Sequence, residues 1–391
     1  MVYGIVDLYV WCERKQWKGV DKTMRVLATG FTDNIGGVES FIMNYYRNFT
    51  ESSIVVDLLG YTDHPAFAQE IRDKGGKIYT IPSPGHRDSY AKLCQFMEEH
   101  AKDYAVIWCN KCELYNIDYL KAAKKYGIPK RIIHSHNSSN MYSGLRKIMV
   151  GTLHHINKKK IERYATDFWT CSDFAAKWLF PAKLLEEKDI VFIPNAIDSK
   201  QFRFEEEIRN VHREKLGASD QIVIGSVGRL TYQKNPGFML EVFNEIYKMN
   251  KNTVLWIVGR GDLEEKMKEK ASHLSCANAV KFLGVRMDVP QLMQAMDCML
   301  LPSRFEGLPV VAVEAQATGL PVVAAKDGIT PQTKLIKSFA FLSLHDSPEK
   351  WAYTTLELCT SQRENTNSTI KQKGFDITVA AKDVQNRLLE K

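Results

Sequence analysis

The chain has 391 residues, of which 45% are hydrophobic and 25% are charged. That composition supplies one or two folded cores and excludes a disordered or fibrous protein. The net charge of +7 is too small an excess to indicate a nucleic-acid-binding protein without a clustered basic patch, so we expect no nucleic-acid partner.

The sequence gives no sign of export or of a membrane span. No apolar run approaches the roughly 18 to 20 residues of a spanning helix, and the start lacks the apolar core of a secretory signal. The eight cysteines are scattered, which favours free thiols. We expect a cytoplasmic protein, or one on the inner face of the cell membrane. Residues 1–23 have no steady hydrophobic period, and we interpret them as an N-terminal extension, either a flexible arm or the result of an early start codon.

From residue 24 onward, short apolar runs alternate with longer amphipathic ones. The strand-like runs of the first half are Val26–Ala28, Ile54–Leu59, Ile78–Ile81, Val106–Trp108 and Ile132–His134. The helical stretches between them include Ser40–Asn48, Ala66–Lys74 and Tyr90–His100. This alternation predicts parallel strands joined by crossover helices.

A second series of the same kind follows Pro194. Its predicted strands are Ile222–Val227, Val254–Val258, Val280–Leu283, Cys298–Leu301 and Val322–Ala324. Its predicted helices are Pro236–Met249, Leu263–Leu274, Val289–Ala295 and Leu308–Thr318. Each series has the size of one doubly wound sheet. We therefore predict two tandem Rossmann-like α/β domains, 24–195 and 196–391, with the last helix as a candidate to cross back to the first domain.

Positive charge gathers in residues 121–160, which hold ten Lys or Arg and no Asp or Glu. Within them, a predicted helix over Leu145–Ile161 places five apolar residues at spacings of three and four: Leu145, Ile148, Met149, Leu153 and Ile156. A basic amphipathic helix can lie on an anionic membrane surface. The alternative is a helix that packs its apolar stripe on its own domain and leaves the lysines in solvent.

Two glutamates stand eight positions apart after the strand that ends at Leu301. Glu306 precedes Gly307 and Leu308 in a loop, and Glu314 lies on the helix that this loop opens. A carboxylate at the C-terminal edge of a parallel sheet suits recognition of vicinal hydroxyls. The alternative has Glu306 capping the helix and Glu314 in solvent. Glu314 lies on a helix that is apolar nearly all round, however, and a buried helix seldom carries an unpaired acid.

This segment resembles the signature of the family 4 retaining glycosyltransferases, which have the two-domain GT-B fold, and is most similar to bacterial enzymes of capsular and extracellular polysaccharide synthesis. The resemblance runs from about Met24 to the C-terminus. Its other motifs are Gly36-Gly37-Val38-Glu39, His134-Ser135-His136-Asn137, Thr170-Cys171-Ser172, Ile193-Pro194-Asn195, Val227-Gly228-Arg229 with Lys234, and Gly259-Arg260-Gly261.

The resemblance implies a role for each matching residue. The donor would be a nucleotide sugar, with Arg229 and Lys234 on its diphosphate, Glu306 on the donor sugar and Glu314 on the ribose. Gly307 and Leu308 would also belong to the donor-binding site. Two cations at a strand-to-helix turn would also stabilise the charge that develops on a leaving phosphate. The first domain would bind the acceptor.

Gly36 and Gly37 let backbone N–H groups approach an anion closely, although an ordinary glycine turn is the alternative. His134 and His136 alternate at the end of a strand, so we expect only one of them to face the cleft between the domains. We favour His136, because the similar family position contacts the donor sugar near the reacting carbon.

No cofactor or tightly bound metal is expected. Cys109 and Cys112 have zinc-ligand spacing, but no second pair completes four ligands. The Gly259–Gly261 segment lacks the third glycine of a dinucleotide fingerprint.

The leading hypothesis is a retaining glycosyltransferase that moves a hexose or N-acetylhexosamine from a UDP-sugar to a lipid-linked or saccharide acceptor. One alternative keeps the fold and changes the reaction to that of a sugar-nucleotide epimerase or a phosphorylase-like enzyme. The other is a non-catalytic sugar-nucleotide-binding or membrane scaffold protein. The sequence does not specify the donor sugar, the acceptor, the linkage or the oligomeric state.

Overall fold

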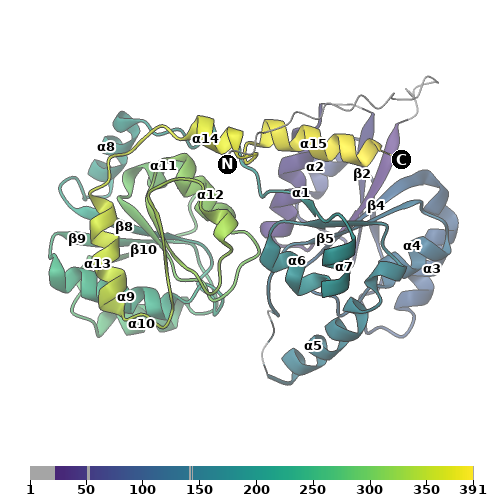
Figure 1. Ribbon diagram of the computed structural model, residues 1–391, viewed down its shortest axis with the longest axis horizontal. Coiled ribbons are helices and arrows are strands. Elements are labelled where there is room, and N and C mark those ends of the chain that lie inside the picture. The colour runs from purple at the N-terminus through teal and green to yellow at the C-terminus, as the bar shows by residue number, and fades with distance from the viewer. Residues whose placement is uncertain (1–22, 51–52, 141, 143, 391) are drawn as a thin grey trace, which may run out of the picture.

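A computed structural model describes residues 23–50, 53–140, 142 and 144–390. The extension predicted over residues 1–23 lies outside the described residues except for its last position. Two parallel sheets, each covered by helices, form the two halves of the molecule (Figure 1). The prediction of two Rossmann-like sheets in one chain is confirmed.

The first sheet has seven strands in the order β3-β2-β1-β4-β5-β6-β7. They are β1 (Met24–Thr29), β2 (Ile54–Gly60), β3 (Ile78–Thr80), β4 (Tyr104–Lys111), β5 (Lys130–Ser135), β6 (Asp167–Thr170) and β7 (Val191–Phe192). The helices between them are α1 (Gly37–Arg47), α2 (Ala68–Asp73), α3 (Ser89–His100), α4 (Asp118–Lys125), α5 (Gly144–Lys158), α6 (Asp173–Leu179) and α7 (Ala182–Glu187). All the strand pairs are parallel, so the carboxyl ends meet at one edge.

The second sheet has six strands in the order β10-β9-β8-β11-β12-β13. They are β8 (Ile222–Val227), β9 (Thr253–Val258), β10 (Val280–Gly284), β11 (Cys298–Leu301), β12 (Val322–Ala325) and β13 (Phe339–Leu342). The helices are α8 (Glu206–Lys215), α9 (Pro236–Met249), α10 (Glu264–Ser272), α11 (Val289–Ala295), α12 (Val310–Ala317) and α13 (Pro348–Cys359). In both sheets the strand order reverses beside the first strand, which is where open α/β sheets bind ligands.

Several predicted boundaries shift for local reasons. The helix predicted over Leu308–Thr318 begins only at Val310, because Pro309 takes an extended backbone at the N-cap. Helix α9 begins at Pro236 as predicted, since proline fits the first turn and Asn235 supplies a left-handed N-cap with φ 54°. The short strands β6, β7 and β13 were absent from the prediction.

The end of the chain returns to the first domain. Helices α14 (Asn367–Gln372) and α15 (Ile377–Leu389) run along the top of Figure 1 from one half to the other. Helix α15 lies against α1, and its buried residues Ile377, Ala381 and Val384 join the core of the first sheet. At the crossing, Ile197 forms a bridge with Asp376, and the Ser199 hydroxyl donates to the Asp376 carboxylate at 2.5 Å.

Candidate active site

Two loops at the carboxyl edge of the second sheet bring Lys234 and Glu306 together. Lys234 follows β8 and Glu306 follows β11, and these strands are neighbours. The Lys234 Nζ atom lies 2.7 Å from Oε1 of Glu306, and the Gln233 amide donates to Oε2 at 3.3 Å. The Glu306 side chain is only 9% exposed, so this ion pair is largely shielded from water. The cation predicted for the diphosphate therefore pairs with the acid predicted for the sugar.

Backbone contacts fix the loop that carries Glu306. Its N–H donates to the carbonyl of Gly328 at 2.7 Å. A Cβ atom on Gly328 would lie 2.4 Å from the carbonyl oxygen of Ser303, so only glycine allows this approach. The alternative in which Glu306 caps the following helix is wrong, because Pro309 holds the N-cap position of α12.

Arg229 lies at the carboxyl end of β8 with an exposed side chain. Together with Gly228 and Lys234 it lines a small pocket above β8 and β11. Gly228 has φ +147°, and a Cβ atom on Gly259 would lie 2.1 Å from the Gly228 carbonyl oxygen. The glycines of the two motifs therefore serve close packing of the β8 and β9 loops beside this pocket.

Glu314 lies on α12 and is half-buried. Burial raises the pKa of its carboxyl group to about 7, and the positive charge of Lys234 acts in the opposite direction. The alternative that placed Glu314 fully in solvent is wrong. An acid with a pKa near neutrality and within reach of the Lys234 charge is a functional-site candidate.

His136 follows β5 at the edge of the first sheet. Its Nε2 atom lies 2.8 Å from Oδ1 of Asn110, at the end of β4. Burial lowers the pKa of His136 to about 3, so the ring is neutral at physiological pH. His136 is nevertheless half-buried, whereas His134 is fully buried.

Alternation along the strand is not what distinguishes the two histidines, although only His136 is partly exposed. Their ring centroids are 4.1 Å apart, and Phe41 packs edge-on against both rings. Residues two apart in a strand share a face, so the rings differ in depth and not in direction. His134 lies beneath, where the Trp108 indole N–H donates to its Nδ1 atom at 3.4 Å.

Gly36 and Gly37 lie at the start of α1, on the carboxyl side of β1. Gly36 is the N-cap, with an extended backbone, and a Cβ atom there would lie 2.7 Å from the Glu39 carboxylate. That carboxylate accepts from the N–H and hydroxyl of Thr32, which orders the loop before α1. A Cβ atom on Gly37 would have no heavy atom within 4 Å.

The two sheet edges touch through Gly307 and Leu308. A Cβ atom on Gly307 would lie 2.2 Å from the carbonyl oxygen of His136, so only glycine permits this contact. The Ser172 hydroxyl donates to the Gly307 carbonyl at 2.6 Å. The Asn195 amide donates to the Leu308 carbonyl at 2.6 Å. The structure thus brings His136, Glu306, Gly307, Leu308 and Lys234 to one junction between the domains.

Other predicted residues lie farther from this junction. Gly36 and Gly37 share the sheet edge with His136 and make no hydrogen bond to the second domain through described residues. The sequence analysis missed Asn110, Ser172 as a contact to Gly307, and the buried Glu113. Asn110 stands inside the Cys109–Cys112 segment, which was considered only for zinc; its position at the end of a predicted strand was the available signal.

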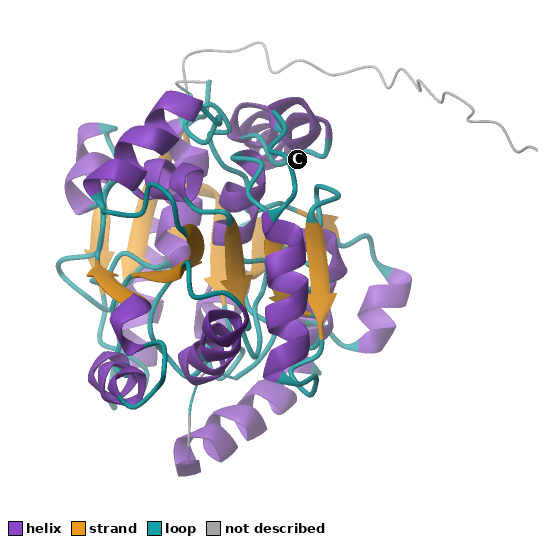
Figure 2. Ribbon diagram, turned by 90° about the vertical axis from the view of Figure 1, so that its left-hand side faces the viewer, coloured by secondary structure: helices purple, strands orange, loops and turns teal. Residues whose placement is uncertain are grey.

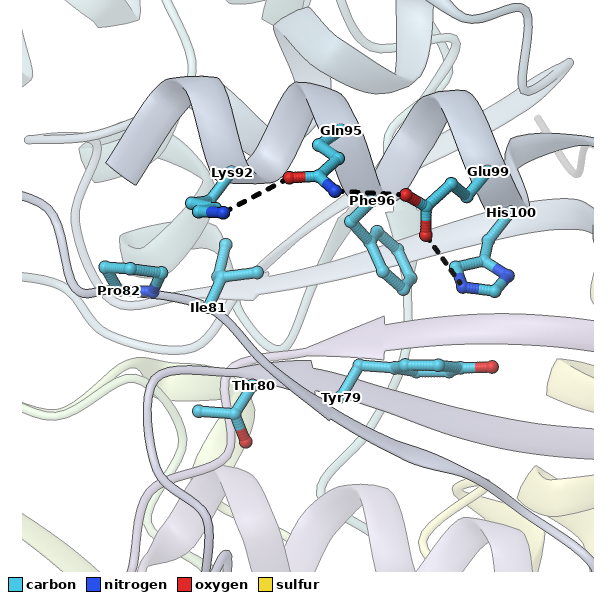
Figure 3. A pocket seen from close by; sticks show the side chains of 9 residues that line it. All are labelled: Tyr79, Thr80, Ile81, Pro82, Lys92, Gln95, Phe96, Glu99 and His100. Carbon is cyan, nitrogen blue, oxygen red and sulfur yellow. Dashed lines mark hydrogen bonds and ion pairs between the residues drawn. The ribbon is translucent and has the colours of Figure 1, made fainter. Parts of the chain in front are cut away.

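The described residues contain no group of three or more His, Cys, Asp or Glu side chains that could hold a metal ion. A further pocket lies between β3 and α3 in the first domain, where Tyr79, Phe96 and His100 bring their rings together (Figure 3). None of the predicted site residues lines it.

Helix α5 extends from the first domain as an arm, at the lower edge of Figures 1 and 2. Its apolar row is exposed, with Leu145 at 86%, Ile148 at 67% and Met149 at 57%. The alternative in which this stripe packs on its own domain is wrong. No helix among the described residues is long and apolar enough to span a membrane.

The polar side of α5 holds it to the domain instead. His154 accepts from the Leu114 N–H at 3.0 Å through Nδ1, and its Nε2 atom lies 3.1 Å from the Trp178 carbonyl. Its ring stacks on Trp178 at 4.1 Å, and the Asn157 amide donates to the Leu114 carbonyl at 2.7 Å. The helix is therefore inverted relative to an ordinary surface helix, in which apolar residues face the core.

The chain is similar in sequence and in structure to known proteins. Residues 208–372 match the family model described as glycosyl transferases group 1. The chain is 29% identical over 350 residues to EpsF of Bacillus subtilis (strain 168), which is named as a glycosyltransferase; the match covers 88% of this chain and 90% of EpsF. The second half of the chain, residues 208–372, is therefore a glycosyl transferases group 1 domain.

Further similarities of this glycosyltransferase are local or structural. It is 34% identical over 133 residues to the Escherichia coli enzyme named UDP-Gal:alpha-D-GlcNAc-diphosphoundecaprenol alpha-1,3-galactosyltransferase, covering 33% of this chain and 34% of that one. The crystal structure of Anabaena Alr3699/HepE in complex with UDP superposes with a TM-score of 0.75 at 20% identity, covering 94% of this chain and all of that chain. HepE has also been solved with UDP-glucose, with a TM-score of 0.72 at 19% identity, covering 94% of this chain and 99% of that chain. The GT-B expectation is confirmed.

Proposed function

We propose that this glycosyltransferase moves a hexose or N-acetylhexosamine from a nucleotide sugar, with a UDP-sugar as first choice, to a hydroxyl of a lipid-linked or saccharide acceptor, with retention of configuration. The observation that carries the proposal is the junction at which Gly307 meets the His136 carbonyl. There the residue that follows Glu306, whose carboxylate pairs with Lys234, meets the backbone of His136.

The charges fit this donor. A nucleoside diphosphate leaving group gains negative charge as the glycosidic bond breaks, and Arg229 and Lys234 would stabilise it at the end of β8. Glu306 would turn from Lys234 toward a donor-sugar hydroxyl, and Glu314 would accept from the ribose. Charge neutralisation is thus assigned to side chains, with no resident metal or cofactor.

The names of the relatives support the acceptor class. Besides the diphosphoundecaprenol galactosyltransferase, the chain is 27% identical over 142 residues to AmsD of Erwinia amylovora, named as an amylovoran biosynthesis glycosyltransferase; the match covers 36% of this chain and 40% of AmsD. We therefore place the reaction in surface polysaccharide synthesis.

A lipid-linked acceptor requires access to a membrane surface, and α5 would bind the protein to that surface. Its exposed apolar row would enter the headgroup region, while Lys159 and Lys160, which directly follow the helix, would contact anionic lipids. We place the protein at the inner face of the cell membrane on this basis.

The test is acceptor-dependent release of nucleoside diphosphate by the purified full chain, over a panel of UDP- and GDP-sugars. Release only when a saccharide or undecaprenyl-diphosphate-linked acceptor is present supports transfer, and an NMR spectrum of the product gives the anomeric configuration. Conversion of the donor without acceptor would favour the epimerase alternative. Binding of donor without any conversion would favour the scaffold alternative.

A pair of variants ties the reaction to the site. Glu306→Gln keeps the shape of the side chain and removes the charge that pairs with Lys234, so we expect a loss of turnover of roughly 100-fold or more. Glu357→Gln makes the same change on the exposed side of α13 and should leave turnover unchanged. Equal turnover of the two variants would contradict the role of Glu306.

A further inference from the structure

Asn110 contributes its side chain to the junction from the end of β4, and it is 3% exposed. Its amide nitrogen donates two hydrogen bonds, one to the Thr29 carbonyl and one to the Trp108 carbonyl, each at 3.2 Å. Both acceptors are backbone oxygens, which cannot donate. The reverse orientation of the amide would place its oxygen against these two carbonyl oxygens, so the orientation is determined by the contacts.

This orientation decides the proton position on His136. The Asn110 Oδ1 atom faces Nε2 of His136 at 2.8 Å and can only accept. The Nε2 atom must therefore carry the proton. Because the ring is neutral, Nδ1 then has a free lone pair, and the described residues offer Nδ1 no hydrogen-bond partner.

We propose that Asn110 is a positioning residue that holds His136 as the Nε2–H tautomer, so that Nδ1 accepts a hydrogen bond from a hydroxyl of the donor sugar. The inference rests on the proposed function for the identity of the ligand. The tautomer itself follows from contacts within the first sheet and does not depend on that function.

The groups packed against His136 do not favour its protonated form. His134 beneath it is also neutral, because burial and then the neighbouring His136 lower its pKa. From α1 the contact is Phe41, which has no charge. The Lys111 carbonyl accepts from the His136 N–H at 3.0 Å, and across the junction Gly307 follows the paired Glu306.

The arrangement has a consequence for substrate choice. A ring nitrogen that only accepts favours a group that donates, and a donor sugar with fluorine at the contacted position would leave Nδ1 unpaired. Loss of such a buried hydrogen bond reduces kcat/KM, and we expect roughly a tenfold reduction or more for that analogue. The same analogue should be no worse than its parent in His136→Ala.

The direct experiment is a ¹⁵N spectrum of the imidazole nitrogens in the histidine-labelled full chain, with the His136 signals assigned by their loss in His136→Gln. We expect a protonated Nε2 and an unprotonated Nδ1, unchanged from about pH 5 to about pH 8. A proton on Nδ1, or titration within this range, would overturn the proposal.

Asn110→Asp gives a second readout. A carboxylate at this position would raise the pKa of His136, and protonation would block Nδ1. Turnover should then fall as the pH is lowered through the raised pKa, whereas the wild-type profile lacks that limb. Asn386→Asp, the same change at an exposed position of α15, is the matched control.

If Asn110→Asp does not fold, the wild-type spectrum alone decides. If the spectrum shows the expected tautomer but no nucleotide sugar is turned over, the proposed function fails and the tautomer stands. If transfer occurs and the spectrum shows a proton on Nδ1, this inference fails and the proposed function stands.

Discussion

The two sheet edges that meet at His136 and Gly307 differ in charge. On the first edge, His136, His134 and Asn110 are neutral hydrogen-bonding groups. On the second edge, Lys234 and Glu306 form an ion pair beside Arg229. Under the proposed function, the second domain would stabilise the charge of the leaving group, while the first would present the neutral ring of His136.

An uncharged histidine has a physical advantage on the first edge. Glycosyl transfer passes through an oxocarbenium-like state with positive charge near the reacting carbon. An imidazolium close to that carbon would repel it, whereas a neutral ring would not. Burial, which lowers the pKa of His136, therefore contributes to the proposed chemistry.

The strongest challenge to this division is the removal of a cation from the second edge. Arg229→Ala should lower kcat by roughly 100- to 1,000-fold, because one electrostatic partner of the leaving group is lost. Because Arg229 is exposed, the unfolding free energy of the Arg229→Ala protein should differ from that of wild type by less than about 0.5 kcal/mol. Lys266→Ala, an exposed cation on α10, should affect neither. Native turnover of Arg229→Ala would refute the role.

A second challenge separates the two edges physically. Gly307→Ala would place a methyl group 2.2 Å from the His136 carbonyl oxygen and 3.0 Å from the Cys171 sulfur, so the edges must move apart. We expect turnover to fall roughly 10- to 100-fold while the circular dichroism spectrum is retained. In the control Gly237→Ala, the new methyl group would lie 3.6 Å from the Lys270 ammonium group, an ordinary contact. Undiminished turnover of Gly307→Ala would show that the contact is unnecessary.

The next test measures how UDP binding depends on the protonation of Glu314, on α12 of the second domain. With its pKa near 7, Glu314 becomes a carboxylate as the pH rises through neutrality, so affinity for UDP should rise several-fold between about pH 6 and about pH 8 if the carboxylate binds the ribose. Glu314→Gln should lose this rise, as measured by calorimetry. An identical pH profile in the two proteins would exclude the ribose contact.

The same pKa shift has a consequence for stability. The folded state keeps a proton that the unfolded state releases above about 4.5, so wild-type unfolding free energy should fall as the pH rises from about 4.5 to about 7. Glu314→Gln removes the contribution of this carboxyl group to the pH dependence of the unfolding free energy. Its stability relative to wild type should therefore be greater at pH 8 than at pH 4.

The smallest effect on turnover is expected at α5, which lies outside both edges. Ile148→Ser should leave unfolding and the turnover of a soluble acceptor unchanged, because Ile148 is 67% exposed. It should reduce cosedimentation with phosphatidylglycerol vesicles. Tyr353→Ser, at an equally exposed position of α13, is the control. Equal vesicle binding by both variants and wild type would refute the membrane role of this helix.

The fold could be predicted largely from the sequence because parallel sheets leave a strong signal. Buried strands such as Thr253–Val258 are continuous apolar runs, and their crossover helices are amphipathic. The strand Val191–Phe192 has only two residues, which is too short to show a pattern. Helix α12 begins at Val310, after Pro309, and not at Leu308 as predicted. Helix propensity alone did not indicate this later start.

The site was predictable as a set of residues and not as a set of contacts. Motifs placed Lys234 and Glu306 at strand ends, but nothing in the sequence shows that they pair with each other. Asn110 was missed because its role depends on Thr29 and Trp108 carbonyls from two strands, which only the folded register brings within reach. The exposure of α5 was undecided because an amphipathic pattern does not state which side faces the protein.

The return of α15 to the first domain determines how this enzyme can open. The chain passes between the domains twice, and the two passages are fastened to each other by the Ile197–Asp376 bridge and the Ser199–Asp376 hydrogen bond. Two adjacent passages permit rotation about one line and resist sliding. On rotation, the contact at Gly307 should therefore open in proportion to its distance from that line, so a small angular change at the passages would control entry of a large substrate.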